Sequence, residues 1–191
     1  MKTAIHRMDG LDIDWGAVQA DYERSQAGIE YPNFSYRAAY DAADPFYGRR
    51  DFYLQAWVDR MFDPDVVGVV MPGYVVTEPH TTTANHIDFE RAGQYRGKTE
   101  HWGRDTFIRR TVINVVIGGD PSQSRVESCK RDGTVLESLS TDRPFLLNTA
   151  KWHRVVNDGD LPRAVLSIGF YQLPFFRAVK LYKAGRLFRP R

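Results

Sequence analysis

His86 and Asp88 are separated by a single residue in the segment 85–89, Asn-His-Ile-Asp-Phe. In a β-strand, residues two apart point to the same face, so this spacing would project an imidazole and a carboxylate together. A distant histidine would complete a set of two histidines and one carboxylate. That set leaves coordination positions open and suits non-haem Fe(II). We predict that the third ligand is His153.

The sequence contains five histidines: His6, His80, His86, His101 and His153. Only His86 has a carboxylate two residues later in a segment that we expect to be extended. A His-x-Asp tripeptide often arises by chance. The alternative interpretation of His86 and Asp88 is therefore a polar pair at the surface, or one that is hydrogen-bonded within the protein. His153 is flanked by apolar residues, where an unpaired imidazole would be costly to bury and a metal ion would satisfy it. His101 is expected in a surface loop at Gly93–Gly103.

Arg163 begins an apolar run ten residues after His153. If residues 163–170 form a strand, Arg163 and Ser167 share one face, and we expect this strand to lie beside that of His153 across a hairpin at 157–160. An arginine that points into the interior requires an anion, and its fork geometry matches a carboxylate. Metal ligands, an inward arginine and a nearby hydroxyl therefore predict a chelating dicarboxylate cosubstrate.

A second, weaker pair of candidates lies on a strand expected at Phe107–Ile117. Arg110 and Asn114 share one face of this strand and could contact the near carboxylate of the cosubstrate or a substrate anion. The alternative for Arg110 is an ordinary surface or salt-bridged arginine. Arg109 falls on the opposite face and is not a candidate.

The first third of the sequence predicts helices. One is expected from Trp15 to about Ala27 with Asp14 as its N-cap. Another begins near Asp44–Pro45, carries an apolar stripe and ends at Asp63–Pro64.

The sequence after residue 65 alternates short β-branched runs with turn signals, Pro72–Gly73 and Asp132–Gly133 among them. Strands are expected at 66–71, 74–77, 85–89, 107–117, 125–130, 134–139, 145–147, 153–156 and 164–171. This order predicts a mainly-β fold, a sandwich, barrel or jelly roll, with N-terminal helices packed outside. We expect a single domain: helical support at 1–64, the β core at 65–172 and a basic C-terminal segment at 173–191.

Composition excludes several classes of function. The net charge is +2, which gives no case for a nucleic-acid binder. One cysteine, no signal peptide and no membrane span leave a cytoplasmic location as the default expectation. Residues 177–191 contain six basic and no acidic residues, typical of a solvated basic helix or of a docking site for an acidic partner. Aromatic residues of the N-terminal helices could form a homodimer face.

The ordered set of His86-x-Asp88, His153 and Arg163 resembles the Fe(II)- and 2-oxoglutarate-dependent dioxygenases over roughly residues 66–172. The segments 153–157 and 163–167 look most like the aspartyl/asparaginyl-hydroxylase and free-amino-acid-hydroxylase branches. The resemblance implies a double-stranded β-helix, which is a cupin-like jelly roll.

The resemblance also implies roles for individual residues. His86, Asp88 and His153 would hold Fe(II), and Arg163, assisted by Ser167, would bind the distal carboxylate of 2-oxoglutarate. With O2, such an enzyme hydroxylates a C–H bond of a small amino-acid-like substrate or a peptidyl residue and produces succinate and CO2. Some branches carry a serine two residues after the arginine, where this sequence has Val165.

Two other classes of function remain open. A non-redox, cupin-like protein would bind a metal or small molecule, or act as an isomerase, and would not need the inward arginine. A partner-binding β-domain would depend on the basic segment, so deleting Lys180–Arg191 would abolish its function and leave its metal content unchanged.

Overall fold

The computed structural model describes residues 3–26, 34–38, 53–88 and 109–190. The helix start at Asp44–Pro45, the loop that contains His101 and the first two residues of the strand expected at Phe107–Ile117 lie outside these ranges. The elements are β1 (Ile5–Arg7), α1 (Trp15–Gln26), β2 (Phe34–Ala38), α2 (Tyr53–Met61), α3 (Pro64–Val67), β3 (Val70–Thr77), β4 (Thr81–Thr82), β5 (Thr111–Gly118), β6 (Ser124–Cys129), β7 (Val135–Leu139), β8 (Phe145–Leu147), β9 (His153–Asn157), β10 (Arg163–Phe170) and α5 (Phe175–Lys183).

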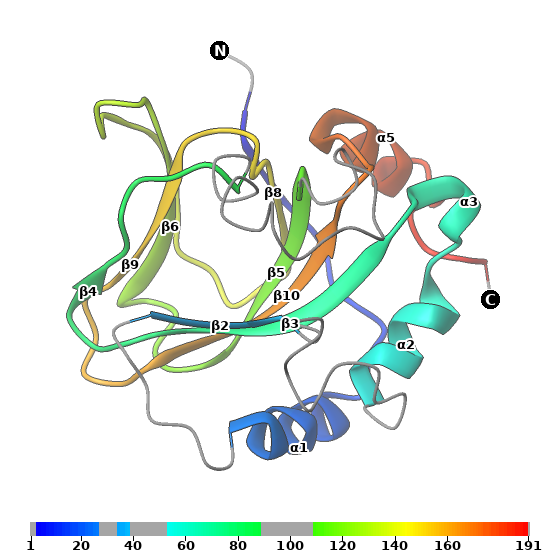
Figure 1. The fold of residues 1–191 in the computed structure, drawn as a ribbon, viewed down its shortest axis with the longest axis horizontal. Coiled ribbons are helices and arrows are strands. Elements are labelled where there is room, and N and C mark those ends of the chain that lie inside the picture. Colours follow the sequence, from blue (N-terminus) through cyan, green and yellow to red (C-terminus); the bar gives the residue numbers. More distant parts are fainter. Residues whose placement is uncertain (1–2, 27–33, 39–52, 89–108, 191) are drawn as a thin grey trace, which may run out of the picture.

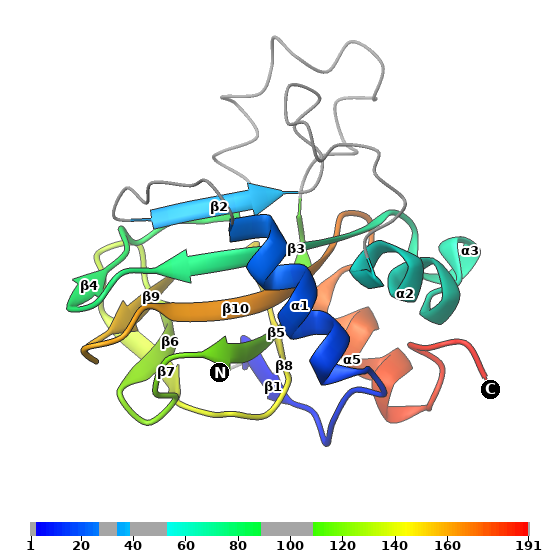
Figure 2. The ribbon, with the colours of Figure 1, turned by 90° about the horizontal axis from the view of Figure 1, so that it is seen from below.

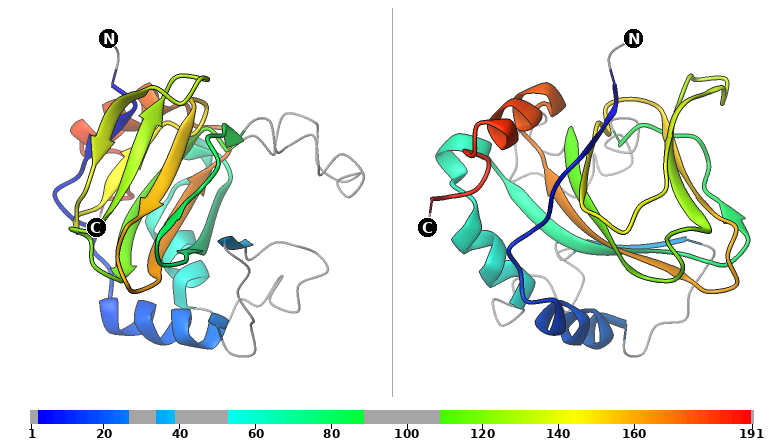
Figure 3. Two further views of the ribbon diagram at one scale, coloured as in Figure 1. Left: turned by 90° about the vertical axis from the view of Figure 1, so that its left-hand side faces the viewer. Right: turned by 180° about the vertical axis from the view of Figure 1, so that it is seen from behind.

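The strands form two antiparallel sheets (Figure 1). The large sheet has the strand order β1-β8-β5-β10-β3-β2, and the small sheet has the order β4-β9-β6-β7. Figure 3 shows the small sheet on one side of the molecule, and Figure 2 shows the helices along the outer face of the large sheet. The mainly-β fold with outer helices that the sequence predicted is confirmed.

Strand β10 separates the outer core from the interior between the sheets. Its residues Leu166, Ile168 and Phe170 pack in one buried cluster with residues of α1, α2 and α5. The alternate residues of β10, which include Arg163, point toward the small sheet. The hydrogen bond from Arg163 Nε to Ser124 Oγ of β6, at 3.1 Å, shows this orientation. Both faces of this strand are therefore buried, which explains its nearly continuous apolar sequence.

Helix α1 begins where the sequence predicts. The Asp14 carboxylate accepts a hydrogen bond from the Ala17 amide at 3.1 Å, as an N-cap does. Further along, the buried Asp21 carboxylate accepts from the Leu54 amide at 3.2 Å and from the Tyr74 hydroxyl at 3.4 Å. One side chain thus links α1 to α2 and to β3.

The prediction of a strand at 66–71 that turns at Pro72–Gly73 is wrong. Asp63 caps the short helix α3, which takes Pro64 at its start and includes Val67. Strand β3 then continues through Pro72, and the ladder to β2 ends at Gly73.

The expected hairpin between the strands of His153 and Arg163 is also wrong. Strand β9 pairs with β6 and β4, whereas β10 pairs with β3 and β5, so residues 158–162 cross from one sheet to the other. Asn157 supports this crossover, because its Nδ2 donates to the carbonyls of Thr77, Glu78 and Leu161 at 2.9–3.1 Å. In contrast, the hairpin predicted at Asp132–Gly133 is confirmed by the pairing of β6 with β7.

The N-terminal part of the chain also contributes two strands that the sequence pattern did not indicate. β1 pairs with β8, and β2 pairs with β3. The Glu137 carboxylate accepts from the Ala4 and Ile5 amides, at 2.8 and 3.2 Å, and holds the chain start against β7. Among the described residues, no helix is long and apolar enough to cross a membrane.

Candidate metal centre

His86 and His153 lie opposite each other across a short antiparallel bridge. The His86 amide donates to the His153 carbonyl at 3.0 Å, and the His153 amide donates to the His86 carbonyl at 2.9 Å. Two residues further on, the Asp88 amide donates to the Thr149 carbonyl at 3.0 Å. This pairing of segments 67 residues apart brings the three predicted ligands together: one potential ligand atom from each lies within 4.8 Å of the others.

The two imidazoles make the same local hydrogen bond through Nδ1. Nδ1 of His86 lies 2.7 Å from the Ala84 carbonyl, and Nδ1 of His153 lies 2.9 Å from the Lys151 carbonyl. Since a carbonyl only accepts, each Nδ1 carries the hydrogen, and the lone pair of the neutral ring is on Nε2. Both Nε2 atoms face the Asp88 carboxylate, at 3.7 and 3.8 Å from Oδ1.

The Asp88 carboxylate divides its two oxygens between different partners. Oδ1 faces the histidines, whereas Oδ2 accepts a hydrogen bond from Arg109 Nε at 2.5 Å. Burial by itself would raise the pKa of Asp88, but the attraction of Arg109 and then of His153 outweighs it and lowers the pKa. Burial lowers the pKa of His153 to about 4, so this imidazole is neutral at physiological pH.

This set of donors fits a divalent transition metal. Two neutral imidazoles and one ionised carboxylate are the ligand set of open non-haem iron sites. Metal–ligand bonds of about 2.1 Å place adjacent ligand atoms of an octahedron about 3 Å apart, somewhat closer than the separations here. Small rotations of the three side chains would therefore suffice to bring them onto one ion.

Arg163 is buried in the interior between the sheets, with 4% of its surface exposed. Its guanidinium donates a hydrogen bond to Ser124. No carboxylate of the described residues lies within ion-pair distance of the guanidinium. Burial lowers the pKa of Arg163 to about 10, so the group is still a cation at neutral pH. A buried cation of this kind is stabilised by an anionic ligand.

Further polar side chains lie on the same inner surface as Arg163. Thr77 is directly opposite Arg163 in the ladder, and Asn114 is directly opposite Ser167, which is also buried. The Oγ1 of Thr77 and the Oδ1 of Asn114 are buried without a hydrogen-bond partner among the described residues. Unsatisfied atoms on the same surface as a guanidinium that has no carboxylate partner among the described residues fit a polar ligand or water.

Arg110 and Arg109 are placed differently from what the sequence suggested. Strand β5 begins only at Thr111, so the expected alternation does not extend to residues 109 and 110. Arg110 is exposed, and the structure does not bring it to the buried set. Arg109, which was not a candidate, contacts Asp88 directly. Its partner is 21 residues away in the sequence, so no spacing pattern could have indicated the pair.

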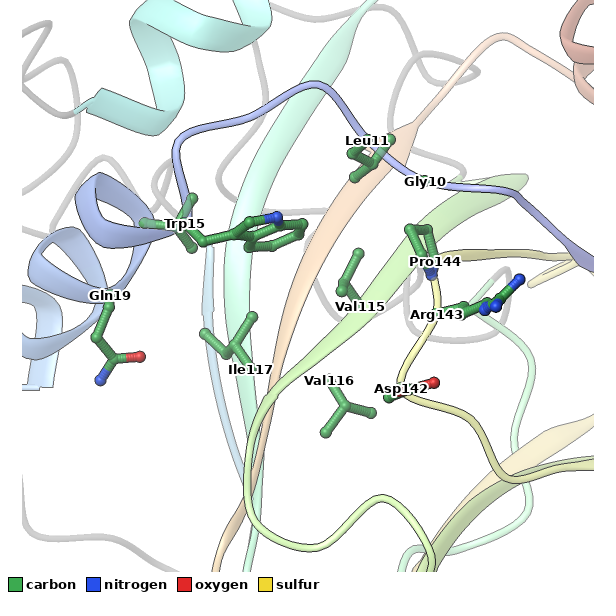
Figure 4. A pocket seen from close by; sticks show the side chains of 11 residues that line it. Gly10, Leu11, Trp15, Gln19, Val115, Val116, Ile117, Asp142, Arg143 and Pro144 are labelled. Carbon is green, nitrogen blue, oxygen red and sulfur yellow. The ribbon is translucent and has the colours of Figure 1, made fainter.

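A separate cavity of about 450 Å³ lies between the start of α1, the end of β5 and the segment Asp142–Pro144 (Figure 4). Trp15 extends over it, and Val115 and Ile117 form part of its wall. None of the predicted site residues lines this cavity.

Solved structures with the same architecture were found by comparison of folds. A prolyl-4-hydroxylase from Pseudomonas putida matches with a TM-score of 0.50 and 11% identity, over 88% of this chain and 92% of that one. The chain has a double-stranded β-helix fold. Two cupin domains match with lower scores. One is from an XRE-family transcriptional regulator of Enterobacter cloacae (TM-score 0.36, 13% identity, 73% and 98% coverage). The other is from Bordetella pertussis (TM-score 0.38, 12% identity, 75% and 98% coverage).

Comparison by sequence adds no family. No protein-family model matches the chain, and no curated protein matches it. At such low identities the structural matches establish the fold alone, and function has to be argued from the site.

Proposed function

We propose that this protein is an Fe(II)- and 2-oxoglutarate-dependent oxygenase that hydroxylates a C–H bond of a small amino-acid-like substrate or of a peptidyl residue. The observation that carries the proposal is a buried guanidinium, that of Arg163, without a carboxylate partner among the described residues. It lies in the same double-stranded β-helix as a group of two histidines and one aspartate that could hold a metal. A non-redox metal-binding cupin would have no need for this cation.

Each group has a defined part in such a reaction. His86, Asp88 and His153 would hold the ion through Nε2, Oδ1 and Nε2, and would leave its other positions for cosubstrate and O2. Bound iron, 2-oxoglutarate and O2 together supply the oxidising chemistry that converts C–H to C–OH with release of succinate and CO2. Arg163 would bind the distal carboxylate of the keto acid, with its guanidinium oriented by Ser124.

The interior also supports the remaining polar contacts. The Oδ1 of Asn114 has no hydrogen-bond partner in the described part of the chain, and Ser167, directly opposite Asn114, offers a hydroxyl on the same surface. The amide N–H of Asn114 and the hydroxyl of Ser167 could donate to keto-acid oxygens. The small sheet and the large sheet enclose these groups and limit the access of water to the bound cosubstrate.

An anaerobic visible spectrum tests the proposal before any substrate is known. Fe(II) and 2-oxoglutarate added together should produce a weak metal-to-ligand charge-transfer band, and each alone should not. Arg163→Ala should weaken 2-oxoglutarate binding by at least about 100-fold, because it removes charge-assisted hydrogen bonds. Co(II) affinity should be retained in this variant.

Asp88→Ala combined with His153→Ala provides the complementary test, since this variant should lose metal binding. Arg154→Ala is a control for Arg163→Ala, because Arg154 pairs with Glu127 on the outer face of the small sheet. Metal binding without a charge-transfer band, or 2-oxoglutarate binding that survives Arg163→Ala, would instead support a non-redox, cupin-like metal-binding protein.

A further inference from the structure

A closed set of contacts surrounds the Asp88 carboxylate. The Asp88 amide donates to the Thr149 carbonyl at 3.0 Å, the Thr149 hydroxyl donates to the Arg109 carbonyl at 2.6 Å, and Arg109 Nε donates to Asp88 Oδ2 at 2.5 Å. Thr149 is fully buried. These three residues come from three separate segments, and each contact fixes the position of the next residue.

The Arg109 side chain reaches Asp88 across the backbone of Gly169. A Cβ built on Gly169 would lie 2.8 Å from Arg109 Cδ and 3.4 Å from its Cγ. The first distance is shorter than van der Waals contact allows, so the path of Arg109 requires a residue without a side chain at this position of β10. Gly169 therefore has a specific reason to be glycine in a strand whose other residues are larger.

The contact has a direct consequence for metal binding. Oδ2 is occupied by a charge-assisted hydrogen bond, and only Oδ1 faces both Nε2 atoms. A carboxylate held in this way coordinates through one oxygen. Bidentate coordination by Asp88 would occupy a further position on the ion.

We infer that Arg109 is a positioning residue that holds Asp88 in one-oxygen coordination, and that Gly169 provides the space for it. The inference rests on the metal-binding part of the proposed function and is independent of the identity of the cosubstrate. Substitution of a residue that orients a metal ligand in this manner typically weakens metal affinity by about 10–100-fold.

The test uses Co(II) as the probe, in the absence of 2-oxoglutarate, and measures affinity by calorimetry and coordination by the visible absorption spectrum. Arg109→Ala and Gly169→Ala should each weaken Co(II) binding by about 10–100-fold and change the spectrum. Arg109→Lys, which keeps the charge but lacks the Nε–H donor, should also change the spectrum. This variant decides the question if Arg109→Ala does not fold.

Arg154→Ala is the matched control. Arg154 Nε donates to Glu127 Oε2 at 2.6 Å in a pair of similar geometry, one residue away from His153 but on the outer face of the small sheet. This variant should lose stability and keep the affinity and spectrum of the wild type.

The inference is overturned if the Arg109 and Gly169 variants bind Co(II) as the wild type does, or if Arg154→Ala changes affinity and spectrum to the same extent. Failure of the wild type to bind Co(II) would instead remove the proposed function itself.

Discussion

At the scale of single residues, the hydrogen on Nδ1 decides what the two histidines can do. Each Nδ1 donates to the carbonyl of the residue two positions earlier, Ala84 for His86 and Lys151 for His153. The same local contact therefore directs both Nε2 lone pairs toward Asp88. Ring orientation is fixed before any ligand binds, which lowers the entropy cost of binding a metal.

The lowered pKa of His153 predicts how the stability of the metal-free protein changes with pH. The unfolded chain takes up a proton on this histidine below about pH 6.5, whereas the folded chain does so only near pH 4. Stability should therefore decrease as the pH falls from 6.5 to 4, by about 3 kcal/mol from this residue at most. Urea unfolding in the presence of a chelator, between pH 7.5 and pH 4.5, measures how the free energy of unfolding changes with pH. This pH dependence should be distinctly smaller in His153→Gln. An unchanged pH dependence would contradict the lowered pKa of His153.

Ser124 predicts a graded effect on cosubstrate binding. Its hydroxyl accepts from Arg163 Nε, so Ser124→Ala should leave the cation in place but less well oriented. One lost hydrogen bond of this kind corresponds to about 1 kcal/mol, or roughly fivefold in 2-oxoglutarate affinity. Calorimetric titration of the Co(II)-loaded protein measures this change. A loss as large as that of Arg163→Ala would mean that the serine, and not the guanidinium, dominates binding.

At the scale of elements, the crossover between β9 and β10 decides where Arg163 points. A hairpin would have placed both strands in one sheet, but the crossover places His153 in the small sheet and Arg163 in the large one. The two residues therefore face the same interior from opposite walls. Asn157 connects this crossover to the end of β3 through three backbone carbonyls.

Asn157→Asp is the sharpest test of the crossover. The substitution keeps an oxygen that accepts from the Gly159 amide, but it removes the donor and places a carboxylate against three carbonyls. Because Asn157 is buried, we expect a loss of about 2–4 kcal/mol in the free energy of unfolding. Chemical unfolding at pH 7.5 provides the measurement. Asp160→Ala in the same segment should have little effect, because the Asp160 side chain is 89% exposed.

At the scale of the whole molecule, the basic C-terminal segment is part of the outer core. Leu181 and Leu187 are buried in the cluster that covers the large sheet, and the Arg189 amide donates to the Met61 carbonyl at 2.8 Å. Lys180 and Lys183 lie on the exposed side of α5. Deletion of Lys180–Arg191 therefore removes core residues together with charge and cannot by itself test a docking role.

The deletion should lower stability by roughly 3–6 kcal/mol, since it exposes the contact surface of two buried leucines. The double substitution Lys180→Gln and Lys183→Gln should keep the stability of the wild type, because both side chains are exposed. Thermal and urea unfolding of the two variants, with Co(II) content as a second readout, compares them. If the double lysine variant lost as much stability as the deletion, the segment would not be stabilised mainly by its buried leucines.

Local pattern was enough for much of the fold. The N-cap at Asp14, the turn at Asp132–Gly133 and the apolar run of β10 depend on neighbouring residues, and each has the predicted structure. Pro72 was misread because a proline is commonly a turn signal, whereas here it lies within β3, opposite Ile168 of β10, and that depends on pairing with a distant strand. Strands β1 and β2 were missed because their pairing partners are distant in sequence.

The sequence by itself determined which side chains could form the site, since the spacing of His86 and Asp88 and the position of Arg163 at the start of an apolar strand are local properties. Only the tertiary structure decided that His86, Asp88 and His153 lie together, and that Arg109 joins Asp88 across Gly169. The physical reason is that a strand's alternation fixes which face a residue occupies, whereas the sheet that a strand enters, and so the partner that this face meets, depends on pairing between segments far apart in the chain.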